Sequence, residues 1–330
     1  MFIRDHLLTK EYLKKPTTYR QFALIGTGVM ILVLYSLVFL TKKHSVSLPA
    51  HPVRVVKKES VSASSSFSKI IPERVFFPRK TLPEPTFLPP VIQVKAQSCH
   101  DLLKLFDAYG YNLHNVRFGN APVPRIVITT LPKDMGKISD TDARKRAFIK
   151  SLLPMILHTN EKILKDREIL FRLAKKPSLT APEKKWLNEL AIRYNLKSVN
   201  IAELKKRVDI VPPSLFLAQA IVETGWGSSS AARHKKSLFG VTLKSGVKSY
   251  ETLQHSVDAY IHNLNYNQAY QSMRELRSQM RDRNMELCSH ALIGQLLSYC
   301  ERRMWYVRNI RQTITKNKLT QFDQCQLETT

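Results

Sequence analysis

Acidic residues are scarce in this chain of 330 residues, which contains 52 Lys and Arg but only 26 Asp and Glu. The formal charge of +26 favours a polyanionic partner such as nucleic acid, anionic lipid or an acidic cell-wall polymer. Yet the basic residues are spread along the whole chain and form no recognisable nucleic-acid-binding motif interleaved with stacking aromatic residues. We therefore expect no nucleic-acid partner, and solubility is a competing explanation of the excess charge.

Cysteine is also rare, and the four cysteines show no CxxC spacing. His234 and His255 have no second histidine or acid at ligand spacing. The sequence thus predicts no metal site and no cofactor. A body outside the cytoplasm could hold one or two disulfides, whereas buried thiols would remain free. The sequence leaves the pairing open for Cys99, Cys288, Cys300 and Cys325.

No charge occurs between Gln21 and Thr41, a stretch long enough to cross the hydrocarbon core of a bilayer. It is longer than the apolar part of a signal peptide, and no A-x-A cleavage site follows it. The sequence therefore predicts a retained transmembrane helix at 21–41 that contacts membrane lipid. Basic residues in the tail 1–20 favour a cytoplasmic N-terminus, but those that follow the span weaken the asymmetry.

The remainder divides by composition into a Pro- and Ser-rich linker at 42–95 and a body at 96–330, with no internal repeat. Most of the body has helical periodicity, and capping signals at Thr180 and Asn200 begin two of the helices. Other expected elements are a short strand or extended segment at 125–131, a hairpin around 244–246, and helical patterns at 142–174, 267–282, 289–301 and 303–317. The predicted fold class is mainly α with one small β-hairpin.

The stretch S-L-F-L-A-Q-A-I-V-E-T-G-W-G at 214–227 places Glu223 at the end of an apolar helix. Pro213 suits the first turn, and Gly225 can adopt the left-handed conformation that ends the helix. The helix dipole, apolar neighbours and Trp226 should all raise the pKa of Glu223, as a general acid requires. Alternatively, Glu223 is merely the last exposed residue of a core helix.

This stretch, together with S-L-F-G at 237–240, resembles the bacterial glucosaminidase domain, in particular that of the Bax-type proteins. The resemblance covers roughly residues 98–323 in several separate blocks. They include V-P-R-I-V-I-T-T-L-P at 123–132, L-L-P-M-I-L-H-T-N-E at 152–161, R-V-D-I-V-P-P-S-L at 207–215 and Y-C-E-R-R-M-W-Y-V-R-N-I-R at 299–311.

The resemblance implies a lysozyme-like α+β fold and hydrolysis of the β-1,4 bond after N-acetylglucosamine in peptidoglycan. It divides the body into a helical part at 96–200 and a catalytic part at 201–330. It also implies a single-pass protein of the bacterial inner membrane with a periplasmic body. Glu223 matches the catalytic acid, Tyr306 an active-site tyrosine, and Phe239 with Gly240 a turn on the far wall of the cleft.

The chain departs from the family at two positions, where Ser237 replaces the usual Asn and Arg303 replaces a Gly. Glycoside hydrolysis normally uses two carboxylates. Glu251 is the only acid between the S-L-F-G turn and the next helix, so it could be a general base or simply a solvated residue. Asp258 lies on that helix, where capping or ion pairing is its expected role. The substrate's 2-acetamido group is another possible nucleophile, and the sequence leaves these routes open.

Aromatic residues are the other candidates for sugar contact. One of Trp305 and Tyr306 should face the cleft, and Trp226 and Tyr250 are further candidates. Two alternatives to an active hydrolase remain. One is a lysozyme-like domain, weakened or inactive, that binds glycan strands without cutting them. The other is a membrane-tethered basic scaffold that recruits anionic partners. The sequence does not identify protein partners.

Overall fold

The computed structural model describes residues 88–243, 246–299 and 303–329. The chain divides into two compact units, 1–75 and 76–330, and all the described residues belong to the second. The predicted tail, the predicted membrane span and most of the predicted linker lie outside the described residues. Within the described part of the chain, no helix combines the length and the apolar character needed to cross a bilayer.

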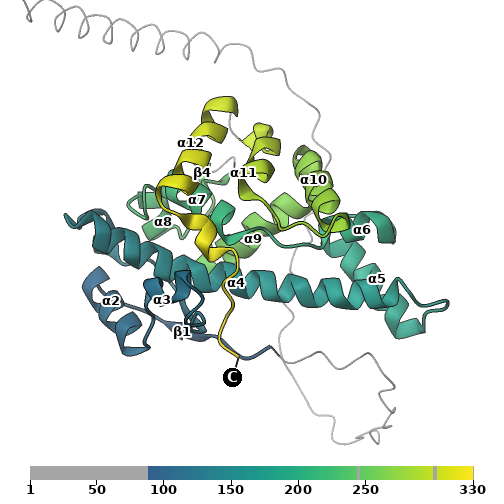
Figure 1. Ribbon diagram of the computed structural model, residues 1–330, viewed down its shortest axis with the longest axis horizontal. Coiled ribbons are helices and arrows are strands. Elements are labelled where there is room, and N and C mark those ends of the chain that lie inside the picture. The colour runs from purple at the N-terminus through teal and green to yellow at the C-terminus, as the bar shows by residue number, and fades with distance from the viewer. Residues whose placement is uncertain (1–87, 244–245, 300–302, 330) are drawn as a thin grey trace, which may run out of the picture. The chain divides into compact units, whose positions relative to one another are not determined.

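One long helix, α4 (Thr141–Leu173), runs through the middle of the body (Figure 1). On one side of it lie α2 (Cys99–Ala108) and α3 (Leu113–Arg117). On the other side lie α7 (Pro213–Thr224), α10 (Gln271–Asp282), α11 (Ser289–Leu292) and α12 (Arg303–Lys316). The Asp140 side chain begins α4 by accepting hydrogen bonds from the first free backbone amides. All residues from 147 to 160 are buried, and the helix continues through Pro154. The helix predicted for 142–174 is thus confirmed.

A small parallel sheet joins β1 (Ile92–Val94) to β2 (Ile126–Ile128), with Ile92 paired to Ile126. The strand expected within 125–131 is confirmed, but its partner comes from residues assigned to the linker. The folded body therefore begins earlier than the sequence indicated, and the hairpin is not its only β element. The short elements around this sheet are α2 (Cys99–Ala108), α3 (Leu113–Arg117) and the 3-10 helix η1 (Lys133–Gly136).

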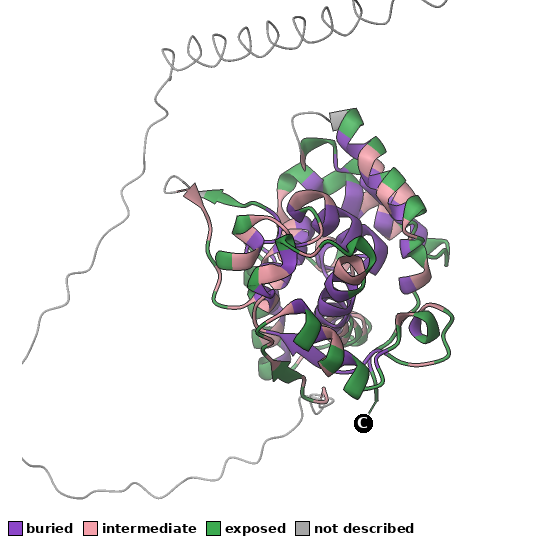
Figure 2. Ribbon diagram, turned by 90° about the vertical axis from the view of Figure 1, so that its left-hand side faces the viewer, coloured by how far each residue is buried: buried purple, intermediate pink, exposed green. Residues whose placement is uncertain are grey.

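The two capping signals are confirmed, because Thr180 and Glu183 form a capping box and Asn200 caps the next helix. These helices are α5 (Ala181–Arg193) and α6 (Ile201–Arg207). Helix α7 (Pro213–Thr224) follows and is almost entirely buried. It packs against α4, α12 (Arg303–Lys316) and the 3-10 helix η5 (Leu319–Phe322). Figure 2 shows buried residues concentrated in the interior helices and exposed residues on the outer faces.

The hairpin is also confirmed: β3 (Thr242–Leu243) and β4 (Gly246–Val247) pair in antiparallel fashion. The helix expected at 289–301 is wrong in extent. A four-residue helix is followed by two 3-10 turns, and Gly294 in the first of them lies close to Arg311 of α12. A Cβ there would lie 3.0 Å from the Arg311 guanidinium. The remaining elements are α8 (Ser230–His234), α9 (Leu253–Tyr266), η2 (Gln268–Tyr270), α10 (Gln271–Asp282), α11 (Ser289–Leu292), η3 (Ile293–Gln295) and η4 (Leu297–Tyr299).

The helix-rich body confirms the mainly α fold class. The three cysteines in the described part of the chain are free: Cys99 is buried, Cys325 is partly buried and Cys288 is exposed. Burial raises the pKa of both Cys99 and Cys325 to about 11, which disfavours their reactive thiolate forms. Cys300 lies outside the described residues.

Candidate active site

Glu223 lies in the last turn of α7, one residue before the helix ends, and its side chain is half-buried. Burial raises the pKa of the Glu223 carboxyl above its usual value, and a hydrogen bond from Tyr306 partly opposes this effect. The Tyr306 hydroxyl donates to Glu223 Oε1 at 2.9 Å across a separation of 83 residues. The raised pKa agrees with the prediction from the sequence, and the tyrosine of the C-terminal helix α12 is the partner.

Tyrosine rings from three further elements lie beside this pair. Tyr306 stacks on Tyr299 of η4 with ring centroids 5.4 Å apart. Tyr299 in turn contacts Tyr260 of α9 at 6.4 Å and Tyr270 of η2 at 6.2 Å. Burial raises the pKa of each of these tyrosines. All four phenols therefore stay neutral at ordinary pH. Together Tyr260, Tyr270, Tyr299 and Tyr306 form an uncharged tyrosine wall beside Glu223.

Sequence reasoning missed Gln219, Tyr260 and Tyr299. Gln219 is fully buried one turn before Glu223 and bonds both to Tyr306 and to Tyr260. A polar residue in an otherwise apolar helix, four positions before the candidate acid, was the signal that could have identified it. Tyr260 gave no such signal, because it lies in the apolar stripe of α9, where packing is the ordinary role of an aromatic residue.

The S-L-F-G turn contacts the tyrosine wall through the ring of Phe239. Phe239 is buried and stacks on Tyr260, with centroids 3.8 Å apart and planes at 14°. Gly240 follows with a left-handed φ of 59° and is exposed. The Ser237 hydroxyl is buried and has no hydrogen-bond partner among the described residues. The Arg303 side chain lies outside the described part.

Three aromatic candidates have other surroundings. Trp226 packs edge-on against Phe148 at 6.0 Å, with the Lys145 ammonium 5.9 Å above its ring. Trp305 lies on α12 and is 55% exposed. Tyr250 lies under the Lys248 ammonium at 4.9 Å. Of the α12 pair, Tyr306 is thus the residue that contacts Glu223.

The candidate second carboxylates do not contact Glu223 within the described residues. The Glu251 side chain is 88% exposed and lies 3.6 Å from His255 Nδ1. Among the described residues, Asp258 neither caps a helix nor forms a salt bridge with a basic side chain. It accepts hydrogen bonds from Thr159 at 2.5 Å and Gln254 at 2.9 Å. Glu223 is therefore the single carboxyl that the described residues bring to the tyrosine wall.

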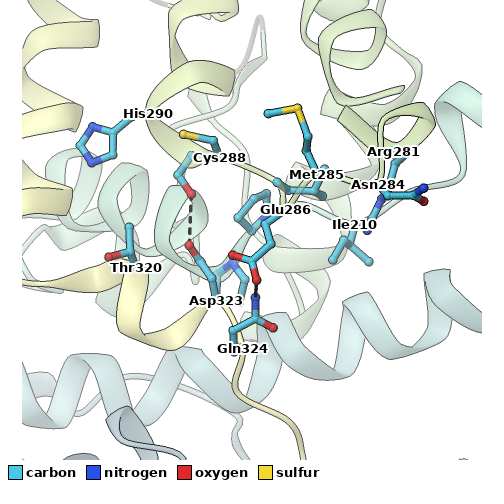
Figure 3. Close-up of a pocket in the computed structure, with 14 residues that line it drawn as sticks. Ile210, Arg281, Asn284, Met285, Glu286, Cys288, His290, Thr320, Asp323 and Gln324 are labelled. Carbon is cyan, nitrogen blue, oxygen red and sulfur yellow. Dashed lines mark hydrogen bonds between the residues drawn. The ribbon is translucent and has the colours of Figure 1, made fainter. Parts of the chain in front are cut away.

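A separate cavity of about 630 Å³ lies at the opposite, N-terminal end of α7 (Figure 3). Asp323 lines it and accepts hydrogen bonds from the backbone amide and the hydroxyl of Ser214, at 2.8 and 2.7 Å. Burial raises the pKa of Asp323 to about 6. This carboxyl caps the first turn of α7, so both ends of the helix carry an acid. Among the described residues, no cluster of three or more His, Cys, Asp or Glu could hold a metal ion.

Comparison with known proteins places this chain in a family. Residues 199–319, which include α7 and α12, match the family model of the glucosaminidases described as mannosyl-glycoprotein endo-beta-N-acetylglucosaminidase. Protein bax of Escherichia coli strain K12 is 32% identical over 195 residues, covering 54% of this chain and 71% of that protein. The chain belongs to the Bax-type glucosaminidase-domain family. No solved structure matches it.

Membership of the Bax-type family supports a glycoside hydrolase-type enzyme related to peptidoglycan. The geometry is compatible with that class. A carboxyl group with a raised pKa, held beside neutral phenols, keeps its proton to a higher pH than an ordinary glutamate and can donate it to a leaving oxygen.

Proposed function

We propose that this chain is a membrane-anchored peptidoglycan hydrolase that cleaves β-1,4 bonds after N-acetylglucosamine, with Glu223 as general acid. Glu223 protonates the glycosidic oxygen as the bond to the sugar breaks, and it is left as a carboxylate. The span 21–41 anchors the chain in the inner membrane of a bacterium, and the body faces the periplasm. These assignments extend the family relationship to the particular residues of this chain.

The observation that carries the proposal is the hydrogen bond between Tyr306 and Glu223. The two residues come from distant parts of the matched segment, yet they meet at a carboxyl whose pKa is raised by burial. A general acid needs a carboxyl that holds its proton more tightly than usual and a fixed position beside the leaving group. Gly240 is exposed and Tyr299 of the tyrosine wall is partly exposed, and these two residues are proposed to contact the sugar.

The second catalytic group is proposed to be the substrate's own 2-acetamido group. Glu251 is almost fully exposed and lies beside His255, an environment that favours an ordinary solvated carboxylate over a general base. A route that uses the acetamido group needs only one protein acid. Glu223 would then serve first as acid and afterwards as base toward water.

Digestion of purified peptidoglycan by the full chain, solubilised in a mild detergent, tests the proposal. The expected products carry N-acetylglucosamine at the new reducing ends. Glu223→Gln should abolish their release while the variant stays folded, because the amide keeps the shape of the side chain and loses the proton. Release by folded Glu223→Gln at the wild-type rate would remove this residue from the mechanism. Binding of glycan strands without any new reducing end would favour the glycan-binding alternative.

Glu251→Gln separates the two catalytic routes. We expect a rate near that of the wild-type chain, because this side chain is exposed and makes no contact with Glu223 within the described residues. A loss of more than about 100-fold, the usual scale for a general base, would instead assign that role to Glu251.

A further inference from the structure

A chain of hydrogen bonds extends behind Glu223 into the core. The Tyr260 hydroxyl of α9 donates to the carbonyl oxygen of the Gln219 side chain. The amide nitrogen of Gln219 donates to the Tyr306 hydroxyl at 3.0 Å. Tyr306 then donates to Glu223 Oε1 at 2.9 Å. Three helices, α7, α9 and α12, each contribute to this chain.

The Gln219 amide gives the chain a direction. An amide has one end that only accepts and one that only donates, whereas a hydroxyl has a single hydrogen and can turn. Tyr260 uses its hydrogen on the accepting end of Gln219. The donating end occupies the oxygen of Tyr306, so the one hydrogen of Tyr306 is directed to Glu223.

Burial and stacking keep water from replacing these bonds. The Gln219 side chain is fully buried, and only 3% of Tyr260 and of Tyr306 is exposed. The Tyr260 ring stacks on Phe239 at 3.8 Å, and the Tyr306 ring stacks on Tyr299 at 5.4 Å. The rings therefore fix both hydroxyl oxygens. A broken bond in the chain would leave a buried polar group without a partner, which is costly.

We propose that Gln219, supported by Tyr260, is a positioning residue that directs the Tyr306 hydrogen to Oε1 of Glu223 and so leaves Oε2 to carry the catalytic proton. The carbonyl oxygen of a carboxylic acid is a better acceptor than its hydroxyl oxygen. Donation to Oε1 therefore favours a proton on Oε2. When Oε2 passes that proton to the glycosidic oxygen, the bond from Tyr306 becomes charge-assisted and stabilises the carboxylate that forms.

This inference rests on the proposed function of Glu223, but the direction of the hydrogen bonds can be measured without activity. The titratable groups that interact with Glu223 within the described residues are the phenols of Tyr260, Tyr299 and Tyr306, all with raised pKa. Donation from Tyr306 lowers the pKa of Glu223 against the effect of burial. Loss of that donation should therefore raise this pKa further.

Infrared difference spectroscopy on the full chain provides the test. Subtracting the spectrum of Glu223→Gln isolates the carbonyl stretch of protonated Glu223, which shifts to lower frequency when the carbonyl accepts a hydrogen bond. Gln219→Met removes the directing amide and should move this band to higher frequency and its titration to higher pH. Tyr260→Phe keeps the ring on Phe239, and it should shift both in the same direction by less. Tyr270→Phe is the matched control, since Asn263 rather than this chain bonds its hydroxyl.

Kinetics on solubilised glycan strands should show kcat reduced by about 10- to 100-fold in Gln219→Met with little change in KM, the scale of one charge-assisted hydrogen bond. A folded Gln219→Met protein with the wild-type band, titration and kcat would overturn the proposal. If Gln219→Met does not fold, Tyr260→Phe decides, and wild-type values there would count against it equally. Shifted bands in a chain that never cleaves peptidoglycan would support the positioning role and refute the proposed function.

Discussion

Gly227→Ala should destabilise the body strongly, because the turn that follows Glu223 has a rare backbone. Gly225, Trp226 and Gly227 all have left-handed φ values, of 57°, 61° and 77°. A Cβ built on Gly227 would lie 3.0 Å from Phe148 Cδ2 and 3.1 Å from Leu131 Cδ1. Both neighbours are buried in the core, so neither can move aside easily.

Two costs add at this position. A non-glycine residue in the left-handed conformation costs about 1–2 kcal/mol. Inserting a methyl group into a packed core costs a further ~1–3 kcal/mol. We therefore expect Gly227→Ala to lower the free energy of unfolding by about 2–5 kcal/mol.

Gly119→Ala is the matched control, since Gly119 has a φ of 71° and nothing within 4 Å of the added Cβ. It should show only the backbone cost of about 1–2 kcal/mol. Urea unfolding of the two variants and the wild-type chain, followed by circular dichroism, measures the difference. Equal losses of unfolding free energy in the two variants would refute the argument that Phe148 and Leu131 leave no room for a Cβ at residue 227.

Three further predictions concern charge. Burial raises the pKa of Glu223 in the folded state, so the wild-type chain loses stability as the pH rises through that pKa. At neutral pH, Glu223→Gln should therefore unfold at a higher urea concentration than the wild-type chain. The difference between their urea midpoints should vanish below the pKa of Glu223 in the unfolded chain. The same sign holds for Asp323, whose pKa rises from 3.8 to about 6. As the pH rises from about 3.8 to about 6, the free energy of unfolding of Asp323→Asn should therefore increase by about 3 kcal/mol relative to that of the wild-type chain. A difference that does not change with pH would mean that the Asp323 carboxyl is not desolvated. Binding of the full chain to peptidoglycan should weaken steeply from low to physiological salt, because the charge of +26 is screened; salt-independent binding in a pelleting assay would assign the affinity to the cleft.

The parts of the fold that the sequence predicts are those decided by neighbours along the chain. Capping residues such as Thr180 and Asn200, and the Pro213 and Gly225 limits of α7, act within one turn of themselves. The raised pKa of Glu223 was predictable for the same reason, because an apolar helix implies burial. The predicted contribution of Trp226 to this raised pKa was not confirmed, since the Trp226 ring packs on Phe148.

The features that the sequence missed depend on contacts between distant residues. Strand β1 is only three residues long and can be recognised as a strand only from its pairing with β2. The hydrogen bond between Gln219 and Tyr306 joins residues 87 positions apart. Neither partner of such a pair has a local pattern that specifies the other. The tyrosine wall could not be predicted either, because a tyrosine in an apolar stripe shows the same sequence pattern whether it packs in the core or lines a site.

The two ends of α7 explain why one hydroxyl matters so much at the candidate acid. At the N-terminal end the helix offers free amides, and Asp323 accepts one of them from Ser214. At the C-terminal end the backbone offers only carbonyl oxygens, which cannot donate to a carboxyl group. Glu223 must therefore obtain its donor from a side chain of another element, and Tyr306 is the only one that lowers its pKa among the described residues. A single hydrogen then opposes the effect of burial, so a residue that directs this hydrogen also determines how readily Glu223 releases its proton.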